Sequence, residues 1–400
     1  MDILLLGQYY YDDQEEYLKS ISKNGISAAH QKLQTNICAG LRNNGNQVTL
    51  LSVLPLGNFP FKSNVFYSRG CSHPNGGIEI DTVNLPCVKH IIRERRVYSE
   101  ITKWIKGDAS SKSIIIYDLY LPFLRAAVKA KKKFGINVFV VVPDIPGKLN
   151  VEYDSYDRIT RFYKDNQADA VKRLIKYADG AFLLTKYMAE VLEITDKPWI
   201  VVEGMVEGFK SSGSYYCDKT FLYSGQLNEQ VGVRSLMTVW DLLPPDYKLY
   251  ICGSGELEKE ILTYASDHSN VEYLGFLGRD KMNGIEEKVS CYINPRKSSE
   301  EYTRYSFPSK TLEYLRTGKP VIAYKLDGIP EDYDDLLFYP DDESPEALAA
   351  KIRNMSDLNT EQLASLREKQ RVFVETKSSK VQCARMMSLI ESVHLTEQKL

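Results

Sequence analysis

A stretch in the C-terminal half, SFPSKTLEYLRTGKPVIAY (306–324), holds the residues best suited to bind a charged ligand. Proline fits the first position of a helix, so a helix is predicted from Pro308, with Ser306 or Phe307 as its cap. Lys310 then lies in the first turn, where a cation is unfavourable by about 0.3–1 kcal/mol. The lysine is explained if an anion rests there, because its ammonium group suits phosphate.

The predicted first turn contributes further polar groups. The amides of Ser309, Lys310 and Thr311 are expected to have no partner within the helix, and with the helix dipole they form an anion site. Glu313 follows Ser309 by four residues and shares its face of the helix. On spacing alone, an ordinary solvated helix start explains these residues equally well.

Two glycine turns in the same half are candidates for close contact between main chain and ligand. YSGQL (223–227) ends a predicted strand at Gly225, and CGSGE (252–256) places Gly253 and Gly255 between a strand and a helix. Glycine permits such an approach because it has no Cβ. The G-x-G pair does not complete a dinucleotide fingerprint, and a tight turn is the alternative reading.

The elements that must position these residues alternate between short apolar strands and helices. This order predicts an α/β protein with parallel sheets and helices on both faces. Residues 8–24 are expected to form a polar loop. Strands are predicted at 2–7, 47–53, 113–118, 137–144, 180–185, 198–204, 220–225, 247–255, 271–277, 289–295 and 320–324.

The pattern occurs twice, which indicates two doubly wound, Rossmann-like domains. A polar stretch rich in Ser and Gly separates the two series and is interpreted as a linker. The predicted division is an N-terminal domain at 1–208, a linker at 209–219, a C-terminal domain at 220–360 and a helical tail at 361–400.

Composition excludes several classes of protein. The chain has 400 residues, 43% hydrophobic and 26% charged, with a net charge of −2, which argues against nucleic acid as a partner. No apolar run is long enough for a transmembrane helix, and a cytoplasmic location is expected. The seven cysteines form no C-x-x-C pair, and no His/Cys cluster has metal-ligand spacing. Neither a metal nor a cofactor is therefore expected.

Four segments of the C-terminal half resemble the retaining group 1 glycosyltransferases of GT-B architecture, in which two Rossmann-like domains face a cleft. The segments are FLYSGQLNEQVGVRSL, YICGSGELEKEI, NVEYLGFLGRDKM and YINPRKSSEEYTRYSFPSKTLEYLRTGKPVIAY. The residues of these segments are most similar to those of bacterial enzymes that build capsule, exopolysaccharide or O-antigen. The N-terminal likeness is thinner and covers GISAAHQKLQTNICAGLRNNGNQVTLLS.

The resemblance implies transfer of a hexose, with retention and without a metal, from a nucleotide diphosphate sugar to a glycan or lipid-linked acceptor. The C-terminal domain would hold the donor, with Glu313 on the ribose hydroxyls, and Lys310 and Arg304 would stabilise the departing diphosphate. The implied donor-binding residues are Gly225, Gln226, Gly253, Gly255, Arg296, Ser309, Lys310, Thr311 and Glu313.

The N-terminal domain would hold the acceptor. Asp144 ends a predicted strand at the carboxyl edge of the sheet, where such sheets place ligands, and is a candidate for catalysis and acceptor binding. Gly25 opens a predicted helix and is a second acceptor-site candidate. Both have structural alternatives, a turn residue and a simple helix start. The basic helix 124–135 is a candidate for contact with a lipid-linked acceptor or the inner face of a membrane, although a solvated helix face is favoured.

The sequence departs from the family pattern at the site itself. Tyr305 stands where the first of two family glutamates is usual, and Gln226 and Val231 replace the Arg and Lys that hold the donor phosphates. Arg296, Arg304 and Lys310 are the candidates for a rebuilt phosphate site. Two alternatives stay open: a nucleotide-sugar epimerase, and a glycosyltransferase-like binding subunit without activity.

Overall fold

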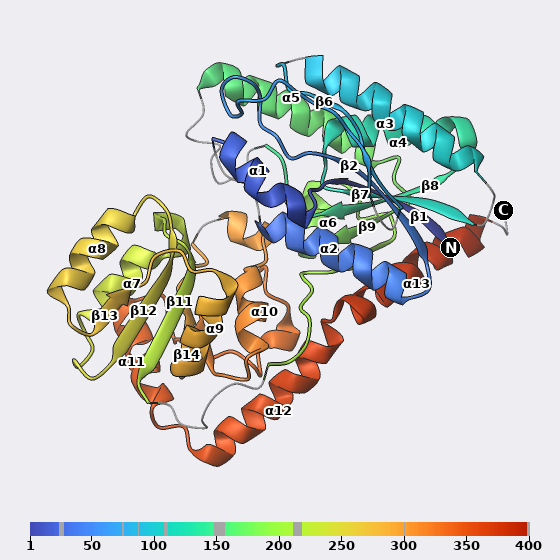
Figure 1. Cartoon of the computed structure of the whole chain (residues 1–400). Coiled ribbons are helices and arrows are strands. Elements are labelled where there is room, and N and C mark those ends of the chain that lie inside the picture. Colours follow the sequence, from blue (N-terminus) through green and yellow to red (C-terminus); the bar gives the residue numbers. More distant parts are fainter. Residues whose placement is uncertain are drawn as a thin grey trace. The chain divides into compact units, whose positions relative to one another are not determined.

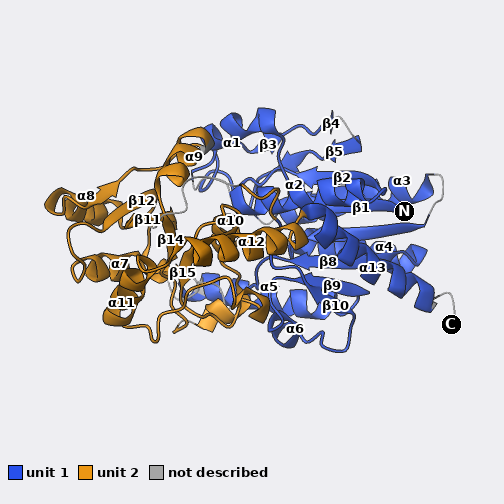
Figure 2. Ribbon diagram, turned by 90° about the horizontal axis from the view of Figure 1, so that it is seen from below, with its two compact units in different colours: residues 1–205, 379–400 blue, residues 206–378 orange. Residues whose placement is uncertain are grey.

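Parallel β-sheets organise both halves of the chain, as the computed structural model shows (Figure 1). The structure describes residues 1–23, 28–73, 76–86, 88–107, 111–147, 157–210, 218–299 and 301–397. It divides into unit 1, residues 1–205 with 379–400, and unit 2, residues 206–378 (Figure 2). The predicted α/β class with two doubly wound sheets is confirmed.

Unit 1 is built on an eight-stranded sheet of order β10-β9-β8-β7-β1-β2-β5-β4, in which only the β4–β5 pair is antiparallel. Its strands read as apolar runs because both faces are covered. The strands are β1 (Asp2–Gln8), β2 (Gln47–Val53), β4 (Ser72–His73), β5 (Gly77–Glu79), β7 (Lys112–Tyr117), β8 (Asn137–Val142), β9 (Gly180–Leu183) and β10 (Trp199–Val201). A separate pair joins β3 (Tyr67–Ser68) to β6 (Thr82–Val83).

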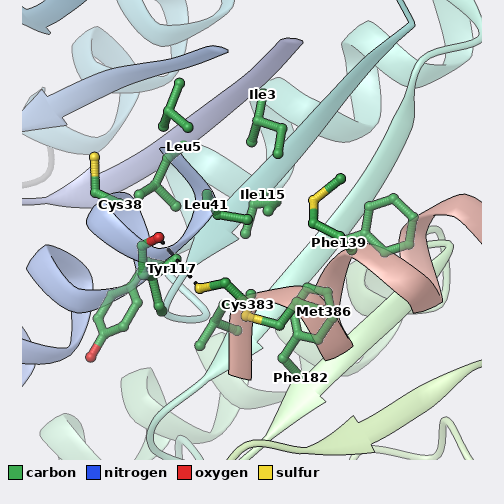
Figure 3. Packing of buried hydrophobic residues seen from close by; sticks show 14 of the residues in the cluster. Ile3, Leu5, Cys38, Leu41, Ile115, Tyr117, Phe139, Phe182, Cys383 and Met386 are labelled. Carbon is green, nitrogen blue, oxygen red and sulfur yellow. Dashed lines mark hydrogen bonds between the residues drawn. The ribbon is translucent and has the colours of Figure 1, made fainter. Parts of the chain in front are cut away.

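Helices cover both faces of this sheet. One face packs against α2 and α13, and the other against α3, α4 and α5. Figure 3 shows the first of these cores, where Ile3 and Leu5 of β1 and Ile115 of β7 lie beside the α13 side chains of Cys383 and Met386. The helices of unit 1 are α1 (Glu15–Ile21), α2 (Ala28–Asn43), α3 (Val88–Lys106), α4 (Leu121–Phe134), α5 (Arg158–Ile175), α6 (Met188–Val191) and α13 (Ser379–Glu397).

The last helix explains why the structural units differ from the predicted domains. A Cβ on Gly40 of α2 would lie 2.4 Å from the main-chain oxygen of Ser379 and 2.6 Å from the sulfur of Cys383. This close packing places α13 in the core of unit 1, whereas the sequence interpretation made 361–400 a separate tail. The first unit also ends near residue 205, and residues 211–217 of the predicted linker lie outside the described residues.

The predicted loop at 8–24 is wrong in part, because it contains helix α1. Leu18 of this helix is fully buried against Tyr10, Leu54 and Leu56. One buried leucine in seven residues is too weak a periodic signal to reveal a helix in the sequence.

Unit 2 holds a five-stranded, all-parallel sheet of order β13-β12-β11-β14-β15. The predicted strands are present here: β11 extends one residue past its predicted carboxyl end, and the other four end one to four residues before theirs. The strands are β11 (Thr220–Gln226), β12 (Lys248–Ser254), β13 (Val271–Tyr273), β14 (Cys291–Asn294) and β15 (Val321–Ala323), and the helices are α7 (Val233–Trp240), α8 (Glu258–Asp267), α9 (Arg279–Lys288), α10 (Ser309–Leu315), α11 (Pro345–Met355) and α12 (Thr360–Thr376).

Candidate functional site

The strand order of unit 2 locates a natural ligand position at its carboxyl edge. From β11 the chain continues to β12 and β13 on one side, whereas β14 and β15 lie on the other. Adjacent strands whose connections leave in opposite directions open a crevice at their carboxyl ends, and ligands of such sheets bind there. The carboxyl ends of β11 and β12, in which Gly225 and Gly253 are strand residues and not turn residues as predicted, and the segment from β14 to α10 border this position. They contain most of the residues selected from the sequence.

Helix α10 is fixed to the end of β11 by Tyr314. The main-chain N–H of Ser224 donates to the Tyr314 hydroxyl (2.9 Å), which in turn lies 3.0 Å from the Ser224 carbonyl oxygen and donates to it. The buried Tyr314 ring also stacks on Tyr292 of β14, with 4.4 Å between centroids. Burial is the main cause of the raised pKa of Tyr314. The helix start is therefore held beside the ends of both strands.

The helix begins one residue later than predicted, at Ser309, with Pro308 as the preceding cap residue. The Thr311 amide donates to the Pro308 carbonyl (2.8 Å), and the buried Thr311 hydroxyl accepts from Asn294 (3.0 Å). The Thr311 amide is thus bonded to the cap residue and is not left free for an anion, contrary to its expected contribution to the anion site. Ser309 and Lys310 are exposed at the helix start.

Lys310 does not stand alone. Its ammonium group lies 2.8 Å from the carboxylate of Glu313 one turn later, with side chains 45% and 30% exposed. Burial lowers the pKa of Lys310, but the charge of Glu313 outweighs it, and the net shift is upward. The lysine is charged, and one of its N–H groups donates to Glu313. The carboxylate of Glu313 therefore partly neutralises the positive charge of the anion site that the sequence predicted.

The two arginines also have partners within unit 2. Arg304 pairs with Asp327, with 3.1 Å between Nε and Oδ2. Arg296 donates to the Ser306 hydroxyl (3.3 Å) and lies over the ring of Tyr302 at 5.5 Å. These contacts hold both guanidinium groups in the segment between β14 and α10.

The three glycines first of all allow the chain to approach itself. Gly253 has a φ of +145°, and a Cβ there would lie 1.8 Å from the carbonyl oxygen of Gly225 on the neighbouring strand. A Cβ on Gly255 would lie 2.3 Å from the carbonyl oxygen of Leu227. Substitution at these positions is excluded by the chain's own backbone, so their glycines by themselves do not require a ligand.

The end of β11 and the loop after it supply no cation at positions 226 and 231, where the resembled family has them. Gln226 is exposed and its carbonyl oxygen accepts from the buried Tyr223 hydroxyl (2.6 Å), while Val231 ends a 3-10 turn. Lys310 and Arg296 are cations whose charges act on these strands. Burial raises the pKa of Cys252 on β12 and of Tyr223 on β11, and the charges of Lys310 and Arg296, respectively, lower these pKa values in part.

Unit 1 has a cavity of about 310 Å³ at the carboxyl ends of β7 and β8. The strand order changes direction between β1 and β7, so the cavity lies next to the switch point of this sheet. Its polar lining consists of His90, Asp118, Tyr120, Asp144, Lys164 and Gln167. Asp144 thus lines a cavity whose volume lies at the small end of the range usual for ligand-binding sites.

Asp144 is paired with a histidine that the sequence did not bring to attention. The exposed Asp144 carboxylate lies 3.1 Å from Nε2 of His30, on the first turn of α2. Burial lowers the pKa of His30, but its hydrogen bond to Asp144 and the charges of Asp118 and Asp144 raise it more. Gly25, the other acceptor-site candidate, lies outside the described residues.

Asp118 is the second residue that the sequence analysis missed. It follows β7 with a φ of +73°, a conformation that costs a non-glycine residue of order 1–3 kcal/mol and is concentrated at functional sites. Its carboxylate accepts from the Leu119 amide (2.6 Å), and burial, the largest effect, raises its pKa. It could have been found by the argument used for Asp144, because each aspartate lies within two residues of the carboxyl end of one of two adjacent parallel strands.

The cavity therefore holds two carboxyl groups in different surroundings. Asp118 is half-buried with a raised pKa, and Asp144 is solvent-exposed beside a histidine. His90 is uncharged at neutral pH, because burial and then the charges of Lys89 and Arg93 lower its pKa to about 4. Such a set can bind sugar hydroxyls and can accept or donate a proton.

The predicted basic helix is α4, and its exposed cations share one face. Arg125, Lys129, Lys132 and Lys133 border a shallow hollow of about 460 Å³. Lys129 lies over Tyr98 at 4.3 Å and Lys132 over Tyr177 at 4.1 Å. No described helix has the length and hydropathy needed to span a bilayer.

Part of the chain matches a known protein family. Residues 218–357, about a third of the chain, match the family model described as "Glycosyl transferases group 1". The matched region contains β11 to β15 and α10, hence every candidate of the unit 2 site. No curated protein sequence is a significant match.

Solved structures of the GT-B fold match almost the whole chain. Sucrose-phosphate synthase from Thermosynechococcus elongatus has a TM-score of 0.67 at 11% identity, with 99% of each chain covered. The lipopolysaccharide outer core galactosyltransferase WaaB has a TM-score of 0.63 at 15% identity, with 98% of this chain and 99% of that chain covered. Anabaena HepE in complex with UDP has a TM-score of 0.63 at 13% identity, with 98% of this chain and 100% of that chain covered. The fold is GT-B, and the fold and the family match together support a glycosyltransferase.

Proposed function

We propose that the protein is a retaining glycosyltransferase that moves a hexose from a nucleotide diphosphate sugar to a glycan or lipid-linked glycan in the synthesis of a surface polysaccharide. Unit 2 binds the donor and unit 1 binds the acceptor. The observation that carries the proposal is that the family match covers the strand ends and helix start at the switch point of unit 2. Two matched structures, HepE and the pneumococcal transferase GtfA, are complexes with UDP, which supports this class of donor.

The donor diphosphate is assigned to the start of α10. The Lys310–Glu313 pair is exposed and local, and pairs of this kind contribute only about 0.3–0.5 kcal/mol. An incoming diphosphate carries more charge than one carboxylate, so it can take Lys310 from Glu313. Glu313 is then released to accept from ribose hydroxyls, and the chain needs no new cation to bind the donor.

Departure of the diphosphate is stabilised by fixed positive charge in place of a metal. Lys310 supplies the main charge. Arg304 and Arg296, in the segment before α10, add further positive charge, and their side chains are held by Asp327 and Ser306, respectively. Groups that are already oriented lower the barrier because they need not reorganise as negative charge develops. The amides of Ser309 and Lys310 contribute to the same site.

The acceptor is assigned to the cavity on β7 and β8. Asp144, oriented by His30, and the half-buried Asp118 accept hydrogen bonds from sugar hydroxyls there. The attacking hydroxyl loses its proton to the leaving phosphate in the retaining scheme that the family resemblance implies. The two aspartates then position the acceptor.

The proposal is tested by incubation with a panel of UDP- and GDP-linked sugars, with and without glycan acceptors. A transferase releases the nucleoside diphosphate in an acceptor-dependent way, and the anomeric configuration of the product, measured by NMR, is that of the donor. An epimerase forms a new nucleotide sugar without any acceptor. Calorimetric titration that detects no binding of UDP or GDP would identify the inactive binding subunit instead.

Lipid-linked acceptors place the enzyme at an anionic membrane surface, and α4 is the element proposed to contact it. Its four exposed cations follow one helix face, and each basic residue near such a surface contributes about 1 kcal/mol. Flotation with vesicles containing phosphatidylglycerol should recover the wild type, and the double variant Lys129→Glu/Lys132→Glu should stay unbound. Equal recovery of both proteins contradicts this contact and leaves a solvated helix face.

A further inference from the structure

We propose that unit 1 contains a zinc site formed by Cys71, His73 and Glu79 on the hairpin of β4 and β5. The sulfur, nitrogen and oxygen ligand atoms of these residues all lie within 4.8 Å of one another. Nε2 of His73 lies 3.2 Å from the Cys71 sulfur and 3.2 Å from a Glu79 carboxylate oxygen. The proposal does not depend on the glycosyltransferase activity.

The hairpin places the three side chains on one face by its register. Ser72 pairs with Ile78, and the Glu79 amide donates to the Cys71 carbonyl (2.8 Å), so Cys71 and Glu79 are directly opposite. Residues two apart on a strand share a face, which adds His73. The antiparallel pairing, which the sequence did not reveal, brings together ligands that are up to eight positions apart.

The separations suit a tetrahedral zinc ion. Zinc binds sulfur at about 2.3 Å and imidazole nitrogen and carboxylate oxygen at about 2.0–2.2 Å, so tetrahedral ligand atoms lie about 3.3–3.6 Å apart. The two distances of 3.2 Å from His73 are close to this range. Cys, His and Glu are all ordinary zinc ligands, and three protein ligands leave the fourth position for water.

The surroundings of the cluster favour a cation over a hydrogen-bonded network alone. The Glu79 side chain is only 2% exposed and that of His73 10%, so the acidic side chain lies almost wholly away from solvent. A buried charge is costly unless it is paired or bound to a metal. A single Nε2 cannot both donate to Glu79 and accept from the thiol of Cys71, whereas one cation accepts a lone pair from all three ligands.

Neighbouring residues already orient two of the ligands. The Gln14 side chain donates to Glu79 (2.7 Å), and the Tyr11 ring stacks on His73 with 3.6 Å between centroids. Gly77 leaves room for this stacking, because a Cβ there would lie 1.8 Å from the Tyr11 hydroxyl. Fixing ligands by outer contacts of this kind is a general feature of metal sites.

The site is separate from the cavity that carries the proposed acceptor function. Strands β5, β2 and β1 lie between β4 and β7 in the sheet. We therefore assign the ion a stabilising role at the exposed edge of the sheet. On binding, Cys71 releases its thiol proton to solvent and coordinates as thiolate.

The test uses the full chain, treated with a chelator and kept reduced. Titration with Zn²⁺ should show one equivalent bound and a higher Tm, and Co²⁺ should give a thiolate charge-transfer band together with the visible bands of a tetrahedral site. Cys71→Ser should abolish the charge-transfer band. Cys71→Ser and His73→Gln should each weaken zinc binding by more than the about 10–100-fold typical of an outer-shell change.

Unit 2 offers a matched control. His268 also stacks on a tyrosine, Tyr264, and also lies 3.1 Å from a carboxylate, that of Asp241, but no described cysteine joins it. His268→Gln should leave stoichiometry and affinity unchanged. The absence of stoichiometric zinc binding to the wild type would overturn the proposal, as would undiminished affinity in Cys71→Ser, whose exposed position makes misfolding no explanation.

Discussion

The hydroxyl of Tyr314 on α10 bonds both main-chain polar groups of Ser224 at the end of β11, at 2.9 and 3.0 Å. All three groups are buried. A single side chain thereby fixes the distance between the carboxyl end of β11 and the start of α10, the helix that carries Lys310. Binding of a diphosphate at this edge depends on that distance.

Tyr314→Phe should therefore lower both stability and donor affinity. The change leaves the buried N–H and C=O of Ser224 without their partner, which costs about 1–3 kcal/mol. Urea denaturation and the donor KM measure the two effects. Tyr324→Phe is the control, since the buried Tyr324 hydroxyl has no hydrogen-bond partner among the described residues. Equal stability losses in the two variants would argue against the positioning role of Tyr314.

Lys310→Ala should weaken UDP or GDP binding about 10- to 100-fold, because a hydrogen bond to a charged group contributes about 1.5–3 kcal/mol. Its stability should change little, since the ion pair with Glu313 is exposed. Calorimetric titration measures the affinity. Lys325→Ala removes another exposed lysine of unit 2 that is paired with an acid, Asp334, and should bind like the wild type. An unchanged affinity in Lys310→Ala removes the lysine from the donor site.

Two glycine-to-alanine substitutions in unit 2 should change the free energy of unfolding in opposite directions. Gly253→Ala forces a Cβ against the Gly225 carbonyl at a positive φ and should destabilise by at least about 1–3 kcal/mol. Gly284→Ala lies inside α9 with open space around its Cβ and should stabilise by about 0.5–1 kcal/mol. Denaturation curves measure both. A neutral Gly253→Ala would contradict the close approach of the ends of β11 and β12.

The His30–Asp144 pair predicts a pH-dependent contribution to stability. Because the folded-state pKa of His30 is raised, the pair stabilises the fold below the unfolded pKa of about 6.5 and loses this effect as pH rises through the folded-state pKa. The effect should stay below about 1 kcal/mol, since both groups are partly exposed. Denaturation of the wild type and His30→Gln on both sides of this range measures it.

Asp144→Asn provides the control for this pH dependence. In that background, His30→Gln should change the pH profile less than in the wild type, because the hydrogen bond and the charge of Asp144 are absent and only the charge of Asp118 still raises the histidine pKa. An undiminished dependence on His30 would assign the shift to Asp118 alone.

The sequence by itself determined the fold class and the location of both candidate sites. Apolar runs alternate with helices, and polar or glycine residues follow the runs, so the carboxyl edges were predictable wherever strands are parallel. The proximity of Lys310 to Glu313 also follows from their spacing, since residues three apart meet on a helix. The shift of the helix start to Ser309 is within the range in which local cap signals are ambiguous.

Only the tertiary structure decided which distant residues meet. His30 reaches Asp144 across 114 positions, Tyr314 reaches Ser224 across 90, and α13 returns to pack on Gly40 of α2. Cys71, His73 and Glu79 converge only once the antiparallel register of β4 and β5 is set. Such contacts depend on how whole elements pack, and packing depends on buried surfaces that many segments share, which a local pattern of residue types does not specify.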